Sequence, residues 1–320
     1  MKDVVIGIDI GGTFTKYGLV DRNGEIYHEG SMPSDKHSDV SDYISALREE
    51  IFKNIDRDAF QIKGVGIGAP NGNYYNGTIE YAPNLRWKGV INLSRLVENE
   101  FTLPVSVTND ANAAAMGEML YGGAKGMKNF IMITLGTGLG SGIVVNGEMV
   151  YGHDGFAGEL GHTIVDPDGR QCACGKMGCL ETYVSAPGIK RTVFELMGMG
   201  IGDSPLKKYC FEELDAKKIS DAANKGDKLA LKAFEYTGRI LGLKLSDAVA
   251  HTSPQAIFLF GGLSKAGDLI IKPTVKYFEK YLLKIYSGKI EIRQSALQDR
   301  NIAVLGAGAL IWDQILKEEK

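Results

Sequence analysis

One unit of sequence occurs twice in this chain of 320 residues, and it constrains the fold more than any other feature. Residues 8–13 (IDIGGT) resemble residues 133–138 (ITLGTG), 125 positions later, and the NGE of residues 23–25 recurs at residues 146–148, 123 positions later. Each copy has the pattern of a strand, a glycine turn, a second strand, an Asn-Gly hairpin and a third strand. A hairpin that is two residues shorter would explain the change in offset. We therefore expect two homologous halves, each headed by a β-meander, with two unrelated hairpins as the alternative.

Hydrophobic periodicity alternates between strand and helix patterns along the rest of the chain. We expect strands at residues 4–10, 14–20, 25–29, 63–69, 104–108 and 256–260, and helices at residues 39–55, 93–101, 109–120 and 305–316. At about 150 residues per domain, the length fits two α/β domains, with a nucleotide cleft between two halves that offer glycine turns to each other.

Composition excludes several classes of protein. The chain has 36 Lys+Arg and 39 Asp+Glu, and no basic run matches a nucleic-acid backbone, so we expect no nucleic-acid partner. No stretch approaches the roughly 18 apolar residues of a membrane span, and the start MKDVVIGIDI lacks a signal-peptide pattern. We expect a cytoplasmic protein that does not bind membranes.

Both glycine turns have the chemistry of a phosphate site, which needs unobstructed backbone N–H groups and a nearby hydroxyl or ammonium group. The candidate residues are Asp9, Gly11, Gly12, Thr13 and Lys16 in the first turn, and Gly136, Thr137 and Gly138 in the second. The Walker and dinucleotide patterns do not fit, because these glycines lead into a strand and not a helix. Asp9 could hold Mg²⁺ directly or through water, or could simply be solvated. A third and weaker copy of the strand and glycine-turn pattern is the apolar strand that ends at Gly261-Gly262.

Four potential metal ligands fall within 18 residues: His162, Cys172, Cys174 and Cys179. Three thiolates and one imidazole suit tetrahedral Zn²⁺, and four protein ligands leave no open position, so we expect a structural zinc site. The alternative is a set of unmetallated thiols, as in many cytosolic proteins. Cys210 lies outside this cluster, and we expect it to be a buried core thiol.

Several polar residues lie where a site could form. Asn109 and Asp110 follow a strand and begin a helix, so they could cap it, or Asp110 could accept a proton from an attacking hydroxyl. Glu159, His162 and Glu181 flank the cysteine cluster, and such groups can bind a polyhydroxylated ligand. Each glutamate taken alone could equally be solvated at the surface.

Together these residues resemble the ROK family of sugar kinases, which share the actin-like ATPase fold of hexokinase and Hsp70. The resemblance covers nearly the whole chain. It rests on the first glycine turn and on residues 66–71 (GIGAPN), 82–87 (APNLRW), 109–113 (NDANA), 135–140 (LGTGLG), 158–162 (GELGH), 172–181 (CACGKMGCLE), 260–262 (FGG) and 306–309 (GAGA). It implies a small domain of residues 1–108 plus about 304–320, and a larger domain of residues 109–303 that carries the zinc loop.

The resemblance also implies roles for single residues. Asp110 would be the base that activates the sugar hydroxyl, and His162 would ligate zinc. The groups that hold the other hydroxyls would be Asn84, Asn109, Glu159, His162 and Glu181. The two glycine turns would bind the triphosphate of ATP, Gly261 and Gly262 would lie near adenosine, and Asp9 would lie near Mg²⁺.

The implied activity is ATP-dependent phosphorylation of a hexose, with glucose as the first choice. N-acetylmannosamine, N-acetylglucosamine, fructose and allose are alternative acceptors, and a non-catalytic sugar or nucleotide sensor is a remote one. The family also contains repressors with a DNA-binding domain ahead of the kinase fold. Because the first expected strand begins at Val4, we do not expect a repressor. Family resemblance suggests a homodimer or homotetramer.

Overall fold

The computed structural model describes residues 1–320 except 54, 57, 201, 202 and 320. Its chain divides into two compact units. The first comprises Met1–Met127, Met149–Ala157 and Asp299–Lys320, and the second comprises Lys128–Glu148 and Gly158–Gln298. The chain therefore leaves and re-enters the first unit twice.

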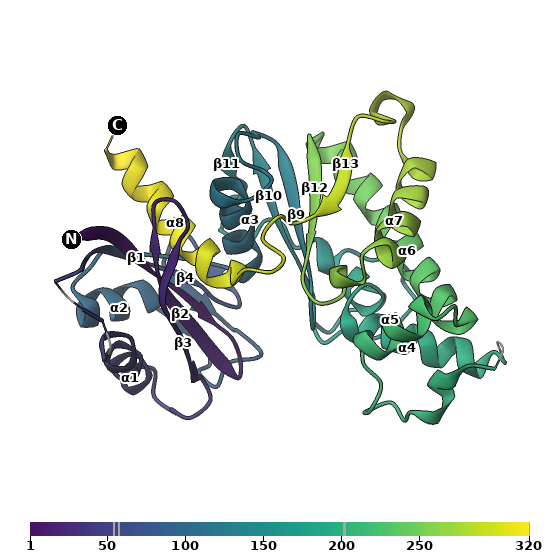
Figure 1. Cartoon of the computed structure of the whole chain (residues 1–320), viewed down its shortest axis with the longest axis horizontal. Helices are drawn as coiled ribbons and strands as arrows, with labels where there is room; N and C mark the ends of the chain where they lie inside the picture. The colour runs from purple at the N-terminus through teal and green to yellow at the C-terminus, as the bar shows by residue number, and fades with distance from the viewer. Residues whose placement is uncertain (54, 57, 201–202, 320) are drawn as a thin grey trace. The chain divides into compact units, whose positions relative to one another are not determined.

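The first unit is built on a five-stranded mixed sheet in the order β3-β2-β1-β4-β8 (Figure 1). Its strands are β1 (Lys2–Ile10), β2 (Phe14–Asp21), β3 (Ile26–Pro33), β4 (Phe60–Gly68) and β8 (Val105–Thr108). The first three strands pair antiparallel as a meander, whereas β4 runs parallel to β1 and β8 parallel to β4. The parallel arrangement brings the carboxyl ends of β1, β4 and β8 to the same edge of the sheet.

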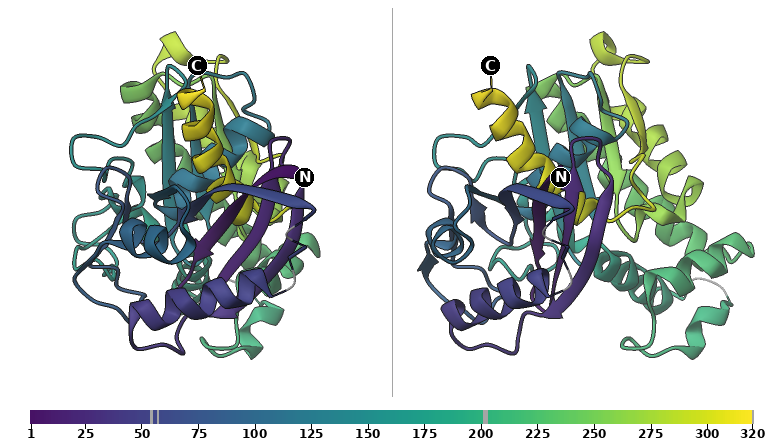
Figure 2. Two further views of the ribbon diagram at one scale, coloured as in Figure 1. Left: turned by 90° about the vertical axis from the view of Figure 1, so that its left-hand side faces the viewer. Right: turned by 60° about the vertical axis from the view of Figure 1, so that its left-hand side comes forward.

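Helices cover both faces of this sheet. Alternate residues of β1, such as Ile6 and Ile8, pack in one core with α1 (Val40–Phe52) and α2 (Leu93–Phe101). The other face receives α8 (Ile302–Glu318), so α1 and α8 lie on opposite sides of the strands (Figure 2). A Cβ at Gly66 of β4 would lie 1.8 Å from the carbonyl oxygen of Ala307, so only glycine lets the α8 backbone approach this closely.

The segment after β4 contains a small sheet that the sequence did not indicate. Between the strand expected at residues 63–69 and the helix expected at residues 93–101, β5 (Gly72–Asn73), β6 (Thr78–Glu80) and β7 (Val90–Ile91) pair antiparallel. These strands are two or three residues long, which is too short to show an alternating pattern.

The helix α3 (Asp110–Tyr121) packs against α8. A Cβ at Gly306 of α8 would lie 2.1 Å from the carbonyl oxygen of Ala113, so the two helix backbones are in close contact. The predicted domain division assigned residues 109–127 to the larger domain, whereas these residues fall within the first unit.

The second unit repeats the strand arrangement of the first. Its sheet has the order β11-β10-β9-β12-β13, made of β9 (Phe130–Leu135), β10 (Leu139–Val145), β11 (Glu148–Met149), β12 (Ala256–Phe260) and β13 (Glu291–Gln294). The strand β12 runs parallel to β9, and β13 runs parallel to β12. The core of the unit joins Ile131, Ile133 and Leu135 of β9 to helices α4 (Ala186–Gly198), α5 (Ala216–Asn224), α6 (Lys228–Thr252) and α7 (Asp268–Tyr281).

The change in sequence offset comes from two places: β10 has seven residues where β2 has eight, and Arg22 precedes the Asn-Gly pair of the first hairpin without a counterpart in the second. Residues 22–25 connect β2 to β3, whereas only Asn146 and Gly147 connect β10 to β11. Both of these residues have positive φ, +56° and +83°, as a two-residue type I′ turn requires. Among the helices that the structure describes, none has both the length and the hydropathy needed to cross a membrane.

Candidate active site

The first glycine turn connects β1 to β2 and contacts the segment that carries Asn84. The N–H of Gly11 donates to the carbonyl oxygen of Phe14 at 3.1 Å, which closes the turn. A Cβ at Gly12 would lie 2.6 Å from the carbonyl oxygen of Asn84, so a glycine is required where these two segments meet. Thr13 and Lys16 are exposed to solvent, so their polar groups are accessible to a ligand.

Two candidate carboxylates of the first unit lie beside each other at the ends of β1 and β8. Both residues are neighbours of Gly68, the last residue of β4. A Cβ at this glycine would lie 3.9 Å from Oδ1 of Asp9 and 3.7 Å from Cα of Asp110. Burial raises the pKa of Asp9 to about 6, and the charge of Asp110 adds to the rise while Lys16 opposes it. Desolvation by surrounding protein atoms also raises the pKa of Asp110, although this residue remains accessible to solvent.

Asn109 has the capping role that its position suggested, and Asp110 is the first residue of the helix. Oδ1 of Asn109 accepts the N–H of Asn112 at 2.6 Å, which caps α3, and Oδ1 of Asp110 accepts the N–H of Ala111 at 2.9 Å. These bonds fix both side chains at the start of the helix. These local bonds occupy Oδ1 in each case, so Nδ2 of Asn109 and Oδ2 of Asp110 are the atoms suited to a ligand.

The second glycine turn lies next to the glycine pair that follows β12. The N–H of Gly136 donates to the carbonyl oxygen of Gly138 at 3.0 Å, and Thr137 between them is exposed. A Cβ at Gly261 would lie 2.5 Å from the carbonyl oxygen of Leu135, where β9 ends. The structure therefore brings Gly261-Gly262 together with the second turn, as strand pairing between β9 and β12 requires.

Glu181 connects this turn to the cysteine cluster. Its Oε2 accepts the N–H of Leu139 at 2.9 Å, and a Cβ at Gly138 would lie 2.5 Å from the same oxygen. Its Oε1 lies 3.9 Å from Sγ of Cys172. Glu181 belongs to η2 (Leu180–Thr182), the short 3₁₀ helix that directly follows Cys179.

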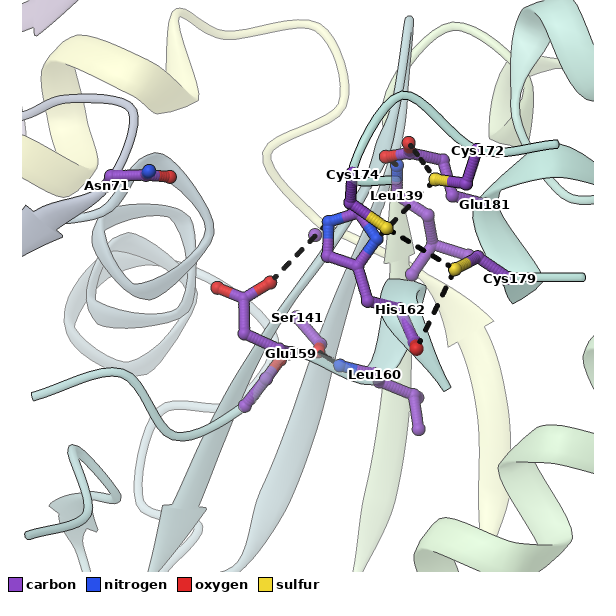
Figure 3. Close-up of polar contacts among 12 residues, drawn as sticks. Asn71, Leu139, Ser141, Glu159, Leu160, His162, Cys172, Cys174, Cys179 and Glu181 are labelled. Atoms are coloured by element: carbon purple, nitrogen blue, oxygen red, sulfur yellow. Dashed lines mark hydrogen bonds and ion pairs between the residues drawn. The ribbon is translucent and has the colours of Figure 1, made fainter. Parts of the chain in front are cut away.

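The four expected metal ligands converge (Figure 3). Their ligand atoms all lie within 4.8 Å of one another; Sγ of Cys174 is 3.6 Å from Sγ of Cys179, and Nδ1 of His162 is 3.8 Å from Sγ of Cys172. A tetrahedron with Zn–S bonds of about 2.3 Å has edges of about 3.8 Å. Both the donor set and its spacing therefore fit Zn²⁺.

The imidazole of His162 has one nitrogen facing the thiols and the other facing Glu159. Its Nε2 lies 4.0 Å from Oε2 of Glu159, while Nδ1 faces Cys172. A zinc ion on Nδ1 would therefore fix the ring and leave Nε2 directed toward Glu159 and any ligand that Glu159 contacts. Glu159 is exposed, and it immediately precedes η1 (Leu160–His162).

Two residues that support these groups were missed in the sequence. Ser141 of β10 donates to the carbonyl oxygen of Gly158 and accepts the N–H of Leu160 at 3.2 Å, so it anchors both neighbours of Glu159. The second residue is Arg170. The signal for it in the sequence was that Arg170 is the only cationic residue between His162 and Cys172.

The expectation that Cys210 is a buried core thiol was wrong, because this thiol is exposed. Leu214, four positions later, is the residue that enters the core.

Comparison with known proteins gives a consistent result. The model of the ROK family matches residues 5–314. A glucokinase from Halalkalibacterium halodurans is 35% identical, over 98% of this chain and 97% of its own length. A xylose repressor from Caldicellulosiruptor bescii is 30% identical, over 98% of this chain and 80% of its own length. The crystal structure of a ROK family glucokinase from Streptomyces griseus in complex with glucose and AMPPNP has a TM-score of 0.79 and 32% identity, covering 96% of this chain and 98% of that one.

Proposed function

This chain belongs to the ROK family, and we propose that it is an ATP-dependent hexose kinase whose main acceptor is glucose. Its fold is the actin-like α/β fold of that family, and the relatives named glucokinase match it along almost their whole length. The observation that carries the proposal is the position of Asp110, a solvent-accessible carboxylate at the start of α3, beside the strand end that leads into the first glycine turn.

In the proposed reaction Asp110 accepts the proton of the sugar hydroxyl. The hydroxyl oxygen forms a bond to the γ-phosphorus of ATP, the bond from that phosphorus to the β,γ-bridging oxygen breaks, and ADP leaves. The raised pKa of Asp110 supports this role, because a carboxylate with a pKa closer to neutral accepts a proton more readily.

The nucleotide would be held by the two glycine turns and Gly261-Gly262. Backbone N–H groups at Gly11, Gly12, Gly136 and Gly138, the hydroxyls of Thr13 and Thr137, and the ammonium of Lys16 would contact phosphate oxygens. Asp9 would hold Mg²⁺ directly or through its water shell. When bound, Mg²⁺ would neutralise charge on the β- and γ-phosphates.

The sugar would be held by amide, carboxylate and imidazole groups, namely Asn84, Asn109, Glu159, His162 and Glu181. We propose that Zn²⁺ bound by His162, Cys172, Cys174 and Cys179 is structural, since four protein ligands complete its coordination. Its contribution would be to fix the ring of His162 and the segment that carries Glu181.

A sugar-responsive regulator is the second candidate function. The observation in its favour is the 30% identity to a xylose repressor, of which this chain matches 80% of the length. Such a protein would bind a sugar without turning over ATP.

A coupled assay of ADP release with glucose, N-acetylmannosamine, N-acetylglucosamine, fructose, allose and xylose tests the proposal. We expect turnover that depends on both ATP and Mg²⁺ and that is greatest with glucose. Greatest turnover with another hexose would correct the acceptor, and sugar binding without any turnover would favour the regulator. Light scattering of the purified protein would test the proposed homodimer or homotetramer.

A further inference from the structure

Arg170 has every donor of its guanidinium group bonded within the second unit. Nε donates to Glu195 at 2.8 Å, and Nη2 donates to Glu195 at 2.6 Å and to Oγ1 of Thr192 at 2.9 Å. Nη1 donates to the carbonyl oxygens of Thr182 at 2.7 Å and Gly188 at 3.0 Å. Only 9% of the side chain is exposed. An arginine that satisfies all its donors when buried is held in a single orientation.

These contacts join the loop that carries the cysteines to two other elements. Thr182 directly follows Glu181 in η2, whereas Gly188, Thr192 and Glu195 belong to α4. The guanidinium carbon also lies 4.4 Å from the ring centre of Tyr183, and the hydroxyl of Tyr183 accepts the N–H of Arg170 at 3.1 Å. Arg170 therefore holds the chain just after Glu181 at two points, the carbonyl oxygen of Thr182 and the side chain of Tyr183.

Glu181 itself requires such support. Its carboxylate lies against Gly138 and Leu139, so its orientation depends on where η2 lies relative to the second glycine turn. The start of α4 is bonded to the same turn, because the N–H of Ala186 donates to the carbonyl oxygen of Gly136 at 2.9 Å. Arg170 fixes η2 against α4 and hence fixes the side chain of Glu181.

We infer that Arg170 is a positioning residue for sugar recognition, acting through Glu181. This inference rests on the proposed function, in which Glu181 binds a sugar hydroxyl. The second glycine turn is also held by the pairing of β9 with β10, which does not involve Arg170. A change at Arg170 should therefore affect the sugar more than the nucleotide.

Lysine cannot replace this arginine. An ammonium group has the same charge but has three donors and no planar fork, so it cannot bond Glu195 bidentately while also reaching Thr182 and Gly188. The variant Arg170→Lys thus keeps the charge and removes the geometry. The matched control is Arg191→Lys, since Arg191 is an exposed arginine of α4 with a bond from Nη1 to the carbonyl oxygen of Gln171 at 3.2 Å.

The test compares steady-state kinetics of the wild type, Arg170→Lys and Arg191→Lys, with zinc content and thermal unfolding measured on each protein. For Arg170→Lys we expect the KM for glucose to rise at least about tenfold, the KM for ATP to change less than about threefold, and the bound zinc to be retained. Arg191→Lys should match the wild type. An unchanged KM for glucose, or equal changes in both KM values, would overturn the inference.

A second variant covers the case in which Arg170→Lys does not fold. Glu195→Gln keeps the shape of the partner, removes its charge, and lies at a half-exposed position. We expect a rise of about threefold in the KM for glucose alone, and no change would count against Arg170. Absence of wild-type turnover with every sugar would refute the proposed function. If the wild type turns over glucose and the Arg170→Lys variant has the same KM for glucose, only the role of Arg170 is refuted.

Discussion

The negative charge of Asp110 raises the pKa of its neighbour Asp9 in the first unit. Burial is the larger cause of the rise to about 6, and Lys16, the cross-strand partner of Asp9, offsets it only in part. Holding Asp9 this close to Asp110 is unfavourable for folding at neutral pH. Asp9 must then be ionised where it is poorly hydrated and next to a second negative charge. This arrangement gives a measurable pH dependence to stability.

The free energy of unfolding should respond to Asp9→Asn in a way that depends on pH. The pKa of Asp9 is higher in the folded chain than the ordinary value of 3.8, so the folded state binds the proton more tightly. Stability from this group is then lost as pH rises from about 4 to about 6. We expect Asp9→Asn to be neutral near pH 4 and stabilising at pH 7, by up to about 3 kcal/mol and by less where water reaches the carboxylate. Urea unfolding without Mg²⁺ at several pH values measures this.

Asp21→Asn provides a control of opposite sign. Burial acts to raise the pKa of Asp21, but hydrogen bonds from Glu25, Asn23 and Tyr27 outweigh it and lower this pKa. Asp21 therefore stabilises the fold above its ordinary pKa, and the loss caused by Asp21→Asn should shrink as pH falls below about 4. Parallel pH profiles for the two variants would contradict both assignments.

Asp110→Ala should lower kcat by at least about 100-fold while glucose still binds, because a general base contributes mainly to the transition state. Stopped-flow or calorimetric binding of glucose, together with kcat, separates the two effects. Asp42→Ala is the matched control, since Asp42 is an exposed acid in the first turn of α1 and its loss removes a similar helix-dipole interaction. A kcat near that of the wild type would exclude Asp110 as the base.

Purified protein should contain about one zinc ion per chain, and Cys174→Ser should lose it. Without the ion, burial and the neighbouring thiols raise the pKa of Cys179 to about 12, so this thiol would be protonated. We expect the KM for glucose to rise more than the KM for ATP. Cys210→Ser, at an exposed thiol outside the cluster, should retain both zinc and kinetics. Full activity in a zinc-free Cys174→Ser protein would refute the structural role.

Gly66→Ala should destabilise the first unit by about 2–4 kcal/mol, because the added methyl would overlap the carbonyl of Ala307 and push α8 from the sheet. Gly198→Ala is the control, since a Cβ at Gly198 would meet no atom within 4 Å. Thermal unfolding should show a fall in Tm for the first variant and little change for the second. Equal Tm values would mean that α8 does not pack as closely as described.

The meanders and their glycine turns could be predicted because their signals are local. Alternating residues and the Asn-Gly pairs specify strands and hairpins, and the two-residue change in offset reflects one residue fewer in β10 and one fewer before Asn146-Gly147. The limits of α2 were predicted as observed, while β3 extends to Pro33, beyond the predicted end at residue 29. The convergence of His162 with the three cysteines was also predictable, since few residues separate them.

Contacts between distant segments could not be predicted in the same way. The bond from Leu139 to Glu181 spans 42 positions, and the donors of Arg170 reach acceptors on two elements. The position of α3 was missed because it depends on its fit against α8, where Gly306 meets Ala113. Residue type alone did not reveal which partner that helix would have.

The return of Asp299–Lys320 to the first unit has a consequence for synthesis of the chain. The face of the first sheet that receives α8 stays uncovered while nearly all of the polypeptide is being translated, whereas the residues of the second unit have all been made by then. The first unit can complete its interior only after α8 has been synthesised and has left the ribosome. Truncations that remove α8 should therefore leave nascent chains that require chaperones or are degraded.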